Sequence, residues 1–177
     1  PKWTRACLGW LRWWRVAESI HEQISAALQT RLRTIAEDQG TTYWYTPDKV
    51  FRVLEFSGAD LDDSYEHLLF LRPDSDTIRE GATSRVEGDA PFTVLIAKRD
   101  ERTSKKPAAE EQDESPIAAT VIGRCVADVR AALLSEVTLG ALAWNVMQGA
   151  SEADFSYAVD GWLCATVTFT VRYDYAS

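Results

Sequence analysis

The stretch WLCATVTFTVRYDY, residues 162–175, constrains the fold more than any other part of the sequence. Apolar and aromatic residues occupy every second position from Leu163 onward, and the positions between them carry Thr166, Thr168, Thr170, Arg172 and Asp174. Successive side chains of a β-strand point to opposite faces of the sheet, so this alternation predicts a long strand with one apolar and one polar face. We expect the helices to bury the apolar face and leave the threonine face outside the core.

Two other segments have apolar residues at the three- and four-residue steps of amphipathic helices. The first helix is expected to run from about Arg15 to Asp38, and the second to run to about Ser135, with Ser115 as its cap and Pro116 in its first turn. Further strands are expected at 50–56, 65–71 and 141–147, and the closing strand is expected to begin near Tyr157. A long strand over 77–99 should be interrupted at 88–91, because proline lacks the amide that a ladder requires.

The order of these elements predicts an α+β fold, a two-layer sandwich. It has an antiparallel sheet of about four to five strands with two amphipathic helices on one face. At 177 residues the chain has the length of one domain, which we place at 17–177, after an N-terminal extension at 1–16. The charged segment 100–116 has no aliphatic side chain larger than alanine and is expected to be a mobile loop.

The N-terminal extension interleaves tryptophans with arginines, which include Trp10, Arg12, Trp13, Trp14 and Arg15. Tryptophan and arginine are enriched at protein interfaces, so we expect this segment to pack against the domain or a neighbouring subunit. Three alternatives stay open: an interfacial membrane segment, a targeting peptide, and an arm that stacks nucleic-acid bases. Arginines at 12 and 15 interrupt any apolar core of a signal peptide.

Composition and motifs favour a structural or binding role over catalysis. The chain carries a net charge of -8, so it should repel nucleic acid rather than neutralise its phosphates. Its three cysteines are widely spaced and form no zinc-binding pair. None of the common nucleophile, phosphate-binding or metalloprotease motifs is present, and we expect no catalytic residue, metal or cofactor.

The individual residues that could carry chemistry have simpler structural interpretations. His21 and His67 have no Cys, Asp or Glu at ligand spacing and are expected to be structural or exposed. The aspartates at 60, 62 and 63 lack the calcium-loop pattern and are expected to form turns. Cys125 falls on the apolar stripe of the second helix and is expected to be inert, whereas Cys164 alternates with threonines and could be accessible.

Several segments together resemble the tail terminator proteins of tailed bacteriophages. They are IHEQISAALQTRLRTI, YWYTPDKVFRV, FTVLIA, VADVRAALL with the following Leu139-Gly140, and VTFTVRYDY, and the resemblance covers about residues 17–175. Its most specific parts are the helix motif with Asp128 and Val129 before Ala131–Leu134, and the end of the closing strand. The tryptophan-rich extension departs from the family's pattern.

The resemblance implies a non-enzymatic virion protein of the tail–neck region, assembled in the host cytoplasm. Such proteins form a hexameric ring on the head-proximal end of the tail tube, stop its growth and present a surface to the head-completion or connector protein. DNA would pass through the ring without sequence-specific binding. The threonine parity, with Arg172 and Asp174, would then face a subunit boundary or the channel. Alternatives are a neck connector ring, a small-molecule or enzymatic domain, and a membrane-surface protein led by its Trp/Arg segment.

Overall fold

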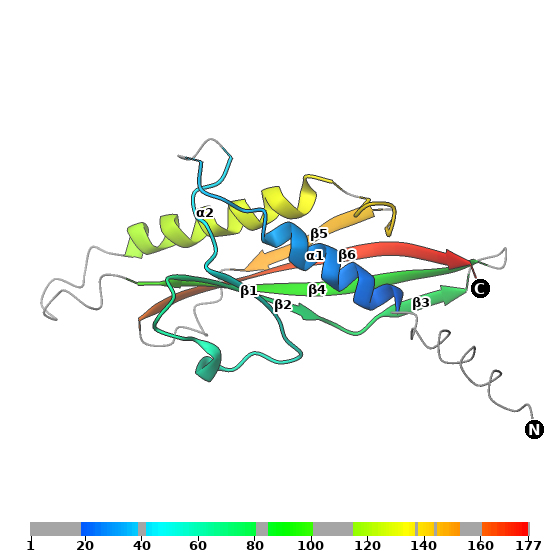
Figure 1. Ribbon diagram of the computed structural model, residues 1–177, viewed down its shortest axis with the longest axis horizontal. Coiled ribbons are helices and arrows are strands. Elements are labelled where there is room, and N and C mark those ends of the chain that lie inside the picture. Colours follow the sequence, from blue (N-terminus) through cyan, green and yellow to red (C-terminus); the bar gives the residue numbers. More distant parts are fainter. Residues whose placement is uncertain are drawn as a thin grey trace, which may run out of the picture.

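The computed structural model describes residues 19–38, 42–80, 85–100, 115–136, 138–143, 145–152 and 161–176 (Figure 1). The elements in chain order are α1 (Ile20–Leu32), β1 (Lys49–Arg52), the 3₁₀ turn η2 (Gly58–Asp60), β2 (His67–Pro73), β3 (Thr77–Glu80), β4 (Arg85–Arg99), α2 (Ser115–Leu134), β5 (Asn145–Glu152) and β6 (Trp162–Ala176). The Trp/Arg-rich extension 1–16 and residues 101–114 of the charged segment 100–116 lie outside the described residues.

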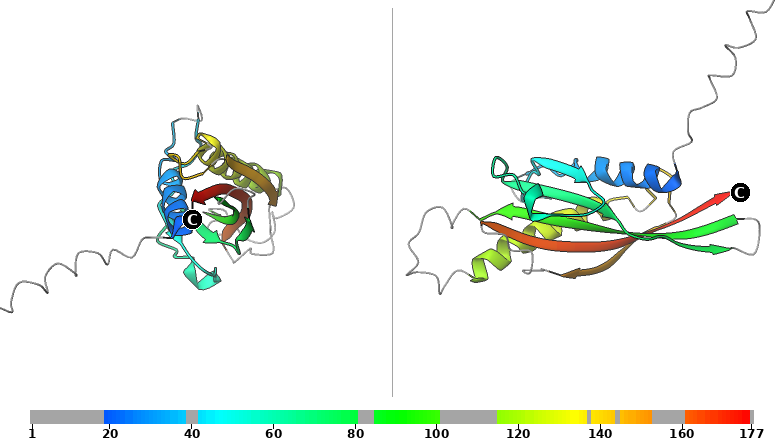
Figure 2. Two further views of the ribbon diagram at one scale, coloured as in Figure 1. Left: turned by 90° about the vertical axis from the view of Figure 1, so that its right-hand side faces the viewer. Right: turned by 90° about the horizontal axis from the view of Figure 1, so that it is seen from below.

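Six strands form one sheet in the order β1-β2-β4-β6-β5, and β3 pairs with β4 beyond the end of β2. All neighbouring pairs are antiparallel except β1 and β2, which run parallel. The expectation of an antiparallel sheet is therefore wrong at this edge. Parallel neighbours need a long connection, and residues 53–66 supply it. The end-on view shows how strongly the strands twist (Figure 2).

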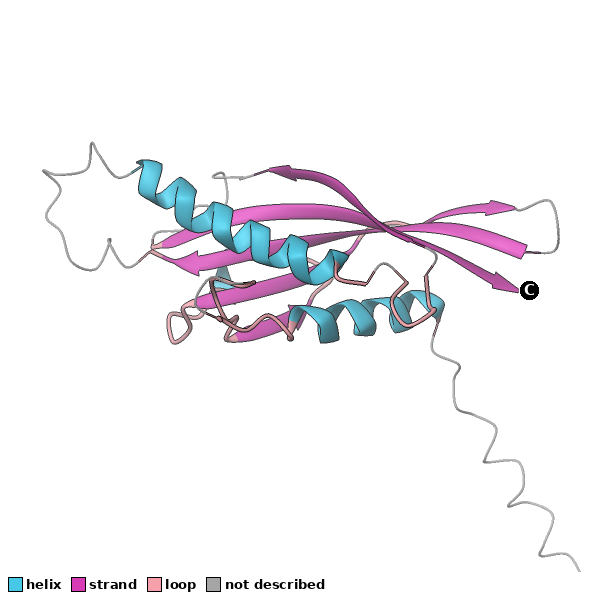
Figure 3. Ribbon diagram, turned by 90° about the horizontal axis from the view of Figure 1, so that it is seen from above, coloured by secondary structure: helices cyan, strands magenta, loops and turns pink. Residues whose placement is uncertain are grey.

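Both helices pack on one face of the sheet, which confirms the two-layer α+β prediction (Figure 3). α1 contributes Ile24, Leu28 and Leu32 to this core, α2 contributes Ile122, Val129 and Leu133, and the strands contribute side chains such as Phe92, Val94, Val167 and Phe169. The rings of Phe92 and Phe169 stack with their centroids 5.8 Å apart. The alternation that predicted a buried parity in β6 thus correctly identified the inner face of the sheet.

The ends of the helices differ from the expected bounds. Ser19 caps α1, since its side chain accepts a hydrogen bond from the backbone N–H of Glu22 at 3.1 Å. The helix ends at Leu32 rather than near Asp38, and the chain then turns at Arg33. α2 begins at Ser115 itself, so this serine is the first helical residue and not the cap.

β4 runs without a break through 88–91, where an interruption was expected. The first part of the expected long strand forms a separate strand, β3, which pairs antiparallel with β4. Pro91 faces the junction between β2 and β3, and its carbonyl accepts a hydrogen bond from the backbone N–H of Asp74 at 2.9 Å. The N and O atoms of one strand residue point to the same side. The missing amide of Pro91 therefore faces a place where the neighbouring ladder is already broken.

The hydrogen bonds of Asp128 explain why an acid lies in the apolar stripe of α2. Its side chain is 1% exposed, and Oδ2 accepts hydrogen bonds from the backbone N–H groups of Trp44 and Tyr45 at 2.9 and 3.0 Å. Burial raises the pKa of this carboxyl, although the two amides act to lower it. One helical side chain thus holds the segment between α1 and β1 against α2.

Gly88 has no room for a side chain. It pairs with Tyr173 across β4 and β6, and a Cβ at position 88 would lie 2.4 Å from Cζ of the tyrosine ring. The hydroxyl of Tyr173 donates to Asp76 Oδ2 at 3.2 Å, which helps to hold the ring there. Gly123, in α2, offers a contrast, because a Cβ there would meet nothing within 4 Å.

Alanine at these two glycines is expected to have opposite effects. Gly88→Ala should lower the free energy of unfolding by about 2 kcal/mol, because the ring of Tyr173 must move out of its place in the core. Gly123→Ala should raise it by about 0.5–1 kcal/mol through helix propensity. Urea denaturation followed by circular dichroism measures both, and equal stability of the two variants would contradict the close packing of Tyr173 on Gly88.

Candidate functional site

The face of the sheet opposite the helices carries the residues expected to be functional. Thr166, Thr168, Thr170, Arg172 and Asp174 lie on this face of β6 and are half-buried. On the neighbouring strand β4, the same face presents Thr93 opposite Thr168 and Pro91 opposite Thr170. No helix of the described part of the chain packs over these positions. We call this surface the open face.

Ion pairs flank the threonines of the open face. Arg172 Nε donates to Asp89 Oδ1 at 2.9 Å, and the two residues pair directly across β6 and β4. Arg72 Nη2 lies 3.0 Å from Asp74 Oδ1, and the hydroxyl of Thr93 donates to Asp74 Oδ2 at 2.8 Å. One charge pair thus crosses from β6 to β4 and the other lies at the end of β2, with short hydroxyls between them. Such a surface suits hydrogen bonding to another protein rather than proton transfer.

One end of this face is buried, which corrects the expectation of a sheet with a single buried side. Trp162 and Cys164 pack with side chains of β2 and β4, and the connection 53–66 folds over them, with Val53, Phe56, Leu61 and Tyr65 against the cluster. Cys164 is 1% exposed, so the expectation that its thiol is accessible is wrong. The physical cause is the parallel pairing of β1, whose long return to β2 covers this end of the sheet.

Where the covered end meets the threonines, the structure leaves a small crevice. It has a volume of about 50 Å³ and is lined by Val53, Phe56, Phe70, Arg72, Thr93, Leu95 and Thr166. Binding sites for cofactors and other small molecules are several times larger, at roughly 300–1,000 Å³. The crevice has room for the tip of one side chain and not for a cofactor.

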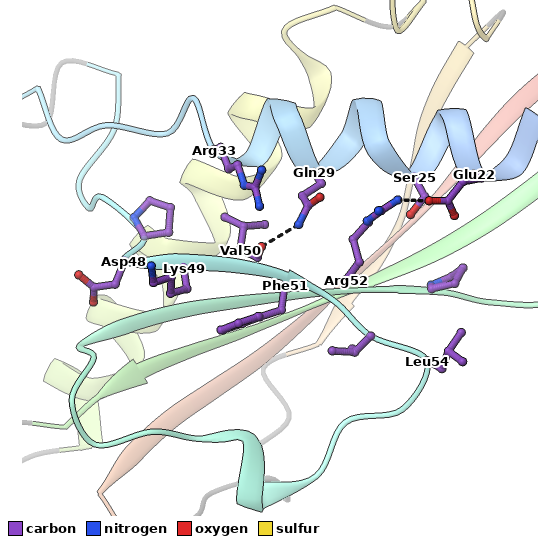
Figure 4. A pocket seen from close by; sticks show the side chains of 13 residues that line it. Glu22, Ser25, Gln29, Arg33, Asp48, Lys49, Val50, Phe51, Arg52 and Leu54 are labelled. Carbon is purple, nitrogen blue, oxygen red and sulfur yellow. Dashed lines mark hydrogen bonds and ion pairs between the residues drawn. The ribbon is translucent and has the colours of Figure 1, made fainter. Parts of the chain in front are cut away.

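A much larger groove, of about 800 Å³, follows the outer edge of β1 beneath α1 (Figure 4). Its lining combines the flank of α1 with the edge strand: Glu22, Ser25, Gln29, Arg33, Pro47, Asp48, Lys49, Val50, Phe51, Arg52, Val53, Leu54 and Pro73. No sequence pattern predicted this groove, although the polar residues of α1 do recur at helical steps. We call it the β1 groove.

The titratable residues expected to be structural have structural partners. His21 Nε2 lies 3.0 Å from Asp76 Oδ1, and its ring stacks on Phe92 with the centroids 5.1 Å apart. His67 is 2% exposed and lies edge-on to Tyr45. Burial, together with the charge of Asp128, raises the pKa of the Cys125 thiol to about 12, which leaves it protonated and inert.

The aspartates of the connection between β1 and β2 form turns, as expected. Asp60 Oδ2 accepts the backbone N–H of Ser57 at 2.8 Å, and Asp62 Oδ1 accepts that of Ser64 at 2.9 Å. Among the described residues, no three His, Cys, Asp or Glu side chains gather in a way that could hold a metal ion. Within that same part of the chain, no helix is long and apolar enough to span a membrane.

The structure brings the five open-face residues of β6 together on one surface, beside Thr93 and the two ion pairs. The expected N-terminal interface residues Trp10, Arg12, Trp13, Trp14 and Arg15 lie outside the described residues. Comparison of the chain with models of known protein families finds no match, and comparison with curated proteins finds no significant relative.

Proposed function

We propose that this chain is a structural protein of a phage virion that assembles into a ring on the head-proximal end of the tail tube. The observation that carries the proposal is the asymmetry of the sheet, which has both helices on one face and half-exposed threonines on the other. The resemblance of the segments around Asp128 and in β6 to tail terminator proteins supports it. The ring would comprise six copies, as that resemblance implies.

Capping requires two unlike surfaces on the ring. One must complement the last ring of the tube, and the other must refuse a further tube subunit and present itself to the head-completion protein. The open face provides hydrogen-bonding hydroxyls without a strong net charge, since Arg172 pairs with Asp89 and Arg72 with Asp74. The acidic chain, with a net charge of -8, would let DNA pass along the channel without gripping it.

A bulky charge in the middle of the open face tests the proposal. Thr168→Arg should leave the fold intact, because Thr168 is half-buried on a face that no helix of the described residues covers, yet it should reduce the fraction of capped tubes at least tenfold. Electron microscopy of tail tubes mixed with purified protein measures this fraction. Ala127→Arg, at an exposed position of α2 on the other side of the molecule, is the matched control.

The outcomes separate the proposal from its alternatives. Wild-type rings on tube ends, lost in Thr168→Arg and retained in Ala127→Arg, support tail termination. Binding to portal-bearing capsids in place of tubes would identify a neck connector. Wild-type protein that binds neither, or Thr168→Arg protein that caps tubes as well as the wild type, would contradict the assigned surface.

A further inference from the structure

We propose that the β1 groove binds an extended acidic segment of a partner protein, which adds to the sheet as a strand beside β1. This inference goes beyond the proposed ring, because the groove lies at the edge of the sheet and not on the open face. The three features that support it are an edge strand with an outer side, an arginine without an ion-pair partner at the α1 wall, and two exposed apolar side chains.

β1 stands at the end of the strand order, and β2 is its neighbour in the described sheet. Proteins usually protect such an edge, because its unpaired backbone groups attract another strand. Here a helix side chain bonds the edge strand: Gln29 Nε2 donates to the carbonyl of Val50 at 2.8 Å. The backbone amide of an added strand is the same kind of donor and could replace this side chain.

The groove has the size and shape for an extended chain. Its volume is about 800 Å³, whereas the crevice on the open face has about 50 Å³. Glu22, Ser25, Gln29 and Arg33 recur at three- and four-residue steps of α1, so they line one flank of the helix and form the upper wall (Figure 4). The edge of β1 forms the lower wall.

The charges in the groove favour an acidic occupant. Its acids are already engaged: Glu22 pairs with Arg52, and Asp48 Oδ2 accepts the backbone N–H groups of Glu66 and His67 at 2.8 and 2.9 Å. Among the described residues, no carboxylate forms an ion pair with Arg33 or Lys49. Arg33 therefore carries an uncompensated positive charge on the α1 side of the groove, in a protein whose net charge is -8. The Nζ of Lys49 lies over the ring of Tyr65, 5.8 Å from its centroid.

The exposed apolar residues of the groove indicate that the bound segment also carries aliphatic side chains. Phe51 is 38% exposed and Leu54 is 83% exposed, and both belong to its lining. Side chains of an added strand alternate between its two faces. Lys49 and Phe51 share one face of β1, whereas Arg33 follows α1 on the other face. A segment with acidic residues on the parity toward α1 and aliphatic residues on the other would place carboxylates near Arg33 and cover Phe51.

Fluorescence anisotropy with a labelled peptide of alternating glutamate and valine tests the inference on the full chain. We expect this peptide to bind at least tenfold more tightly than its lysine–valine counterpart. Arg33→Glu should weaken binding about fivefold, since it turns an attraction into a repulsion. Arg124→Glu, the matched control, removes an exposed arginine of α2 that stacks on Trp44 and should leave binding within twofold of the wild type.

A third peptide tests the backbone contacts. N-methylation of alternate amides removes the donors that a strand must offer, so binding should fall at least tenfold. Equal binding of the glutamate and lysine peptides would overturn the inference, as would equal losses in Arg33→Glu and Arg124→Glu. Undiminished binding of the N-methylated peptide would rule out strand addition. Thr168→Arg should bind the peptide normally, so failure of the ring proposal leaves this result interpretable.

Discussion

Replacing Asp128 with alanine is expected to lower the free energy of unfolding by about 3 kcal/mol. The substitution removes the acceptor of two backbone amides, those of Trp44 and Tyr45, and leaves both without a partner in a partly buried place. It also opens a space in the interface between α2 and the segment before β1. Equilibrium unfolding in urea at pH 7, followed by tryptophan fluorescence and circular dichroism, measures the loss.

Asp128→Asn is the matched control. The asparagine keeps a side-chain oxygen that can accept from both amides, and it removes a charge whose burial raises the pKa of the native carboxyl. Its loss should be about 1 kcal/mol, clearly smaller than that of the alanine variant. If Asp128→Ala proved as stable as the wild type, the carboxylate would not be what holds this segment to α2.

Acidification is expected to destabilise the protein through His67, by about 3 kcal/mol between pH 6.5 and pH 4. Burial of the ring, aided by the charge of Lys98, lowers the pKa of His67 from 6.5 to about 4 in the folded state. In this pH range the unfolded chain therefore binds a proton that the folded chain does not bind. Stability from this source is complete above pH 6.5 and is lost as the pH falls toward 4.

The groups that face His67 come from three segments. Lys98 lies opposite it on β4, the ring of Tyr45 lies edge-on to it, and the carboxylate of Asp48 accepts its backbone amide. Burial acts to raise the pKa of Asp48, but the amides of His67 and Glu66 hold it below its usual value. Asp48 therefore titrates below the range in which His67 dominates.

His67→Gln tests this origin of the acid sensitivity. Glutamine does not titrate, so the variant should lose some stability at neutral pH but show a much flatter dependence between pH 6.5 and pH 4.5. Unfolding free energies of both proteins at half-unit intervals give the difference directly. A parallel decline in the two proteins would show that the sensitivity arises elsewhere.

Local patterns predicted the presence of both helices and of β6, because their information lies within short stretches, but they misplaced the end of α1 and an interruption in β4. The alternation in β6 identified its buried parity, and the spacing in α2 identified the helix to within one residue of its observed end. The parallel pairing of β1 could not be predicted in this way, since β2 is the next strand along the chain and only the path of residues 53–66 makes the two strands parallel rather than a hairpin. The path of residues 53–66 over Cys164 follows from that pairing and was missed with it.

The same distinction holds for the candidate sites. Thr166, Thr168 and Thr170 could be placed on one face from parity alone, and the structure places them there. The β1 groove could not be found from the sequence, because it depends on β1 standing at the edge of the sheet and on the packing of α1 beside that edge. Asp128 carried a signal, as an acid within an apolar helical stripe, but its partners are backbone amides that no motif specifies.

The reactivity of a cysteine placed on the open face tests most directly whether that face is an assembly surface. Thr168→Cys, in a Cys7→Ser background, would be labelled with a maleimide before and after incubation with tail tubes; the native Cys125 and Cys164 are buried. Ala127→Cys serves as the control on α2. We predict that assembly slows labelling at position 168 at least tenfold and leaves position 127 unchanged. Equal labelling rates at position 168 in the free and tube-bound protein would contradict the proposed role of the open face.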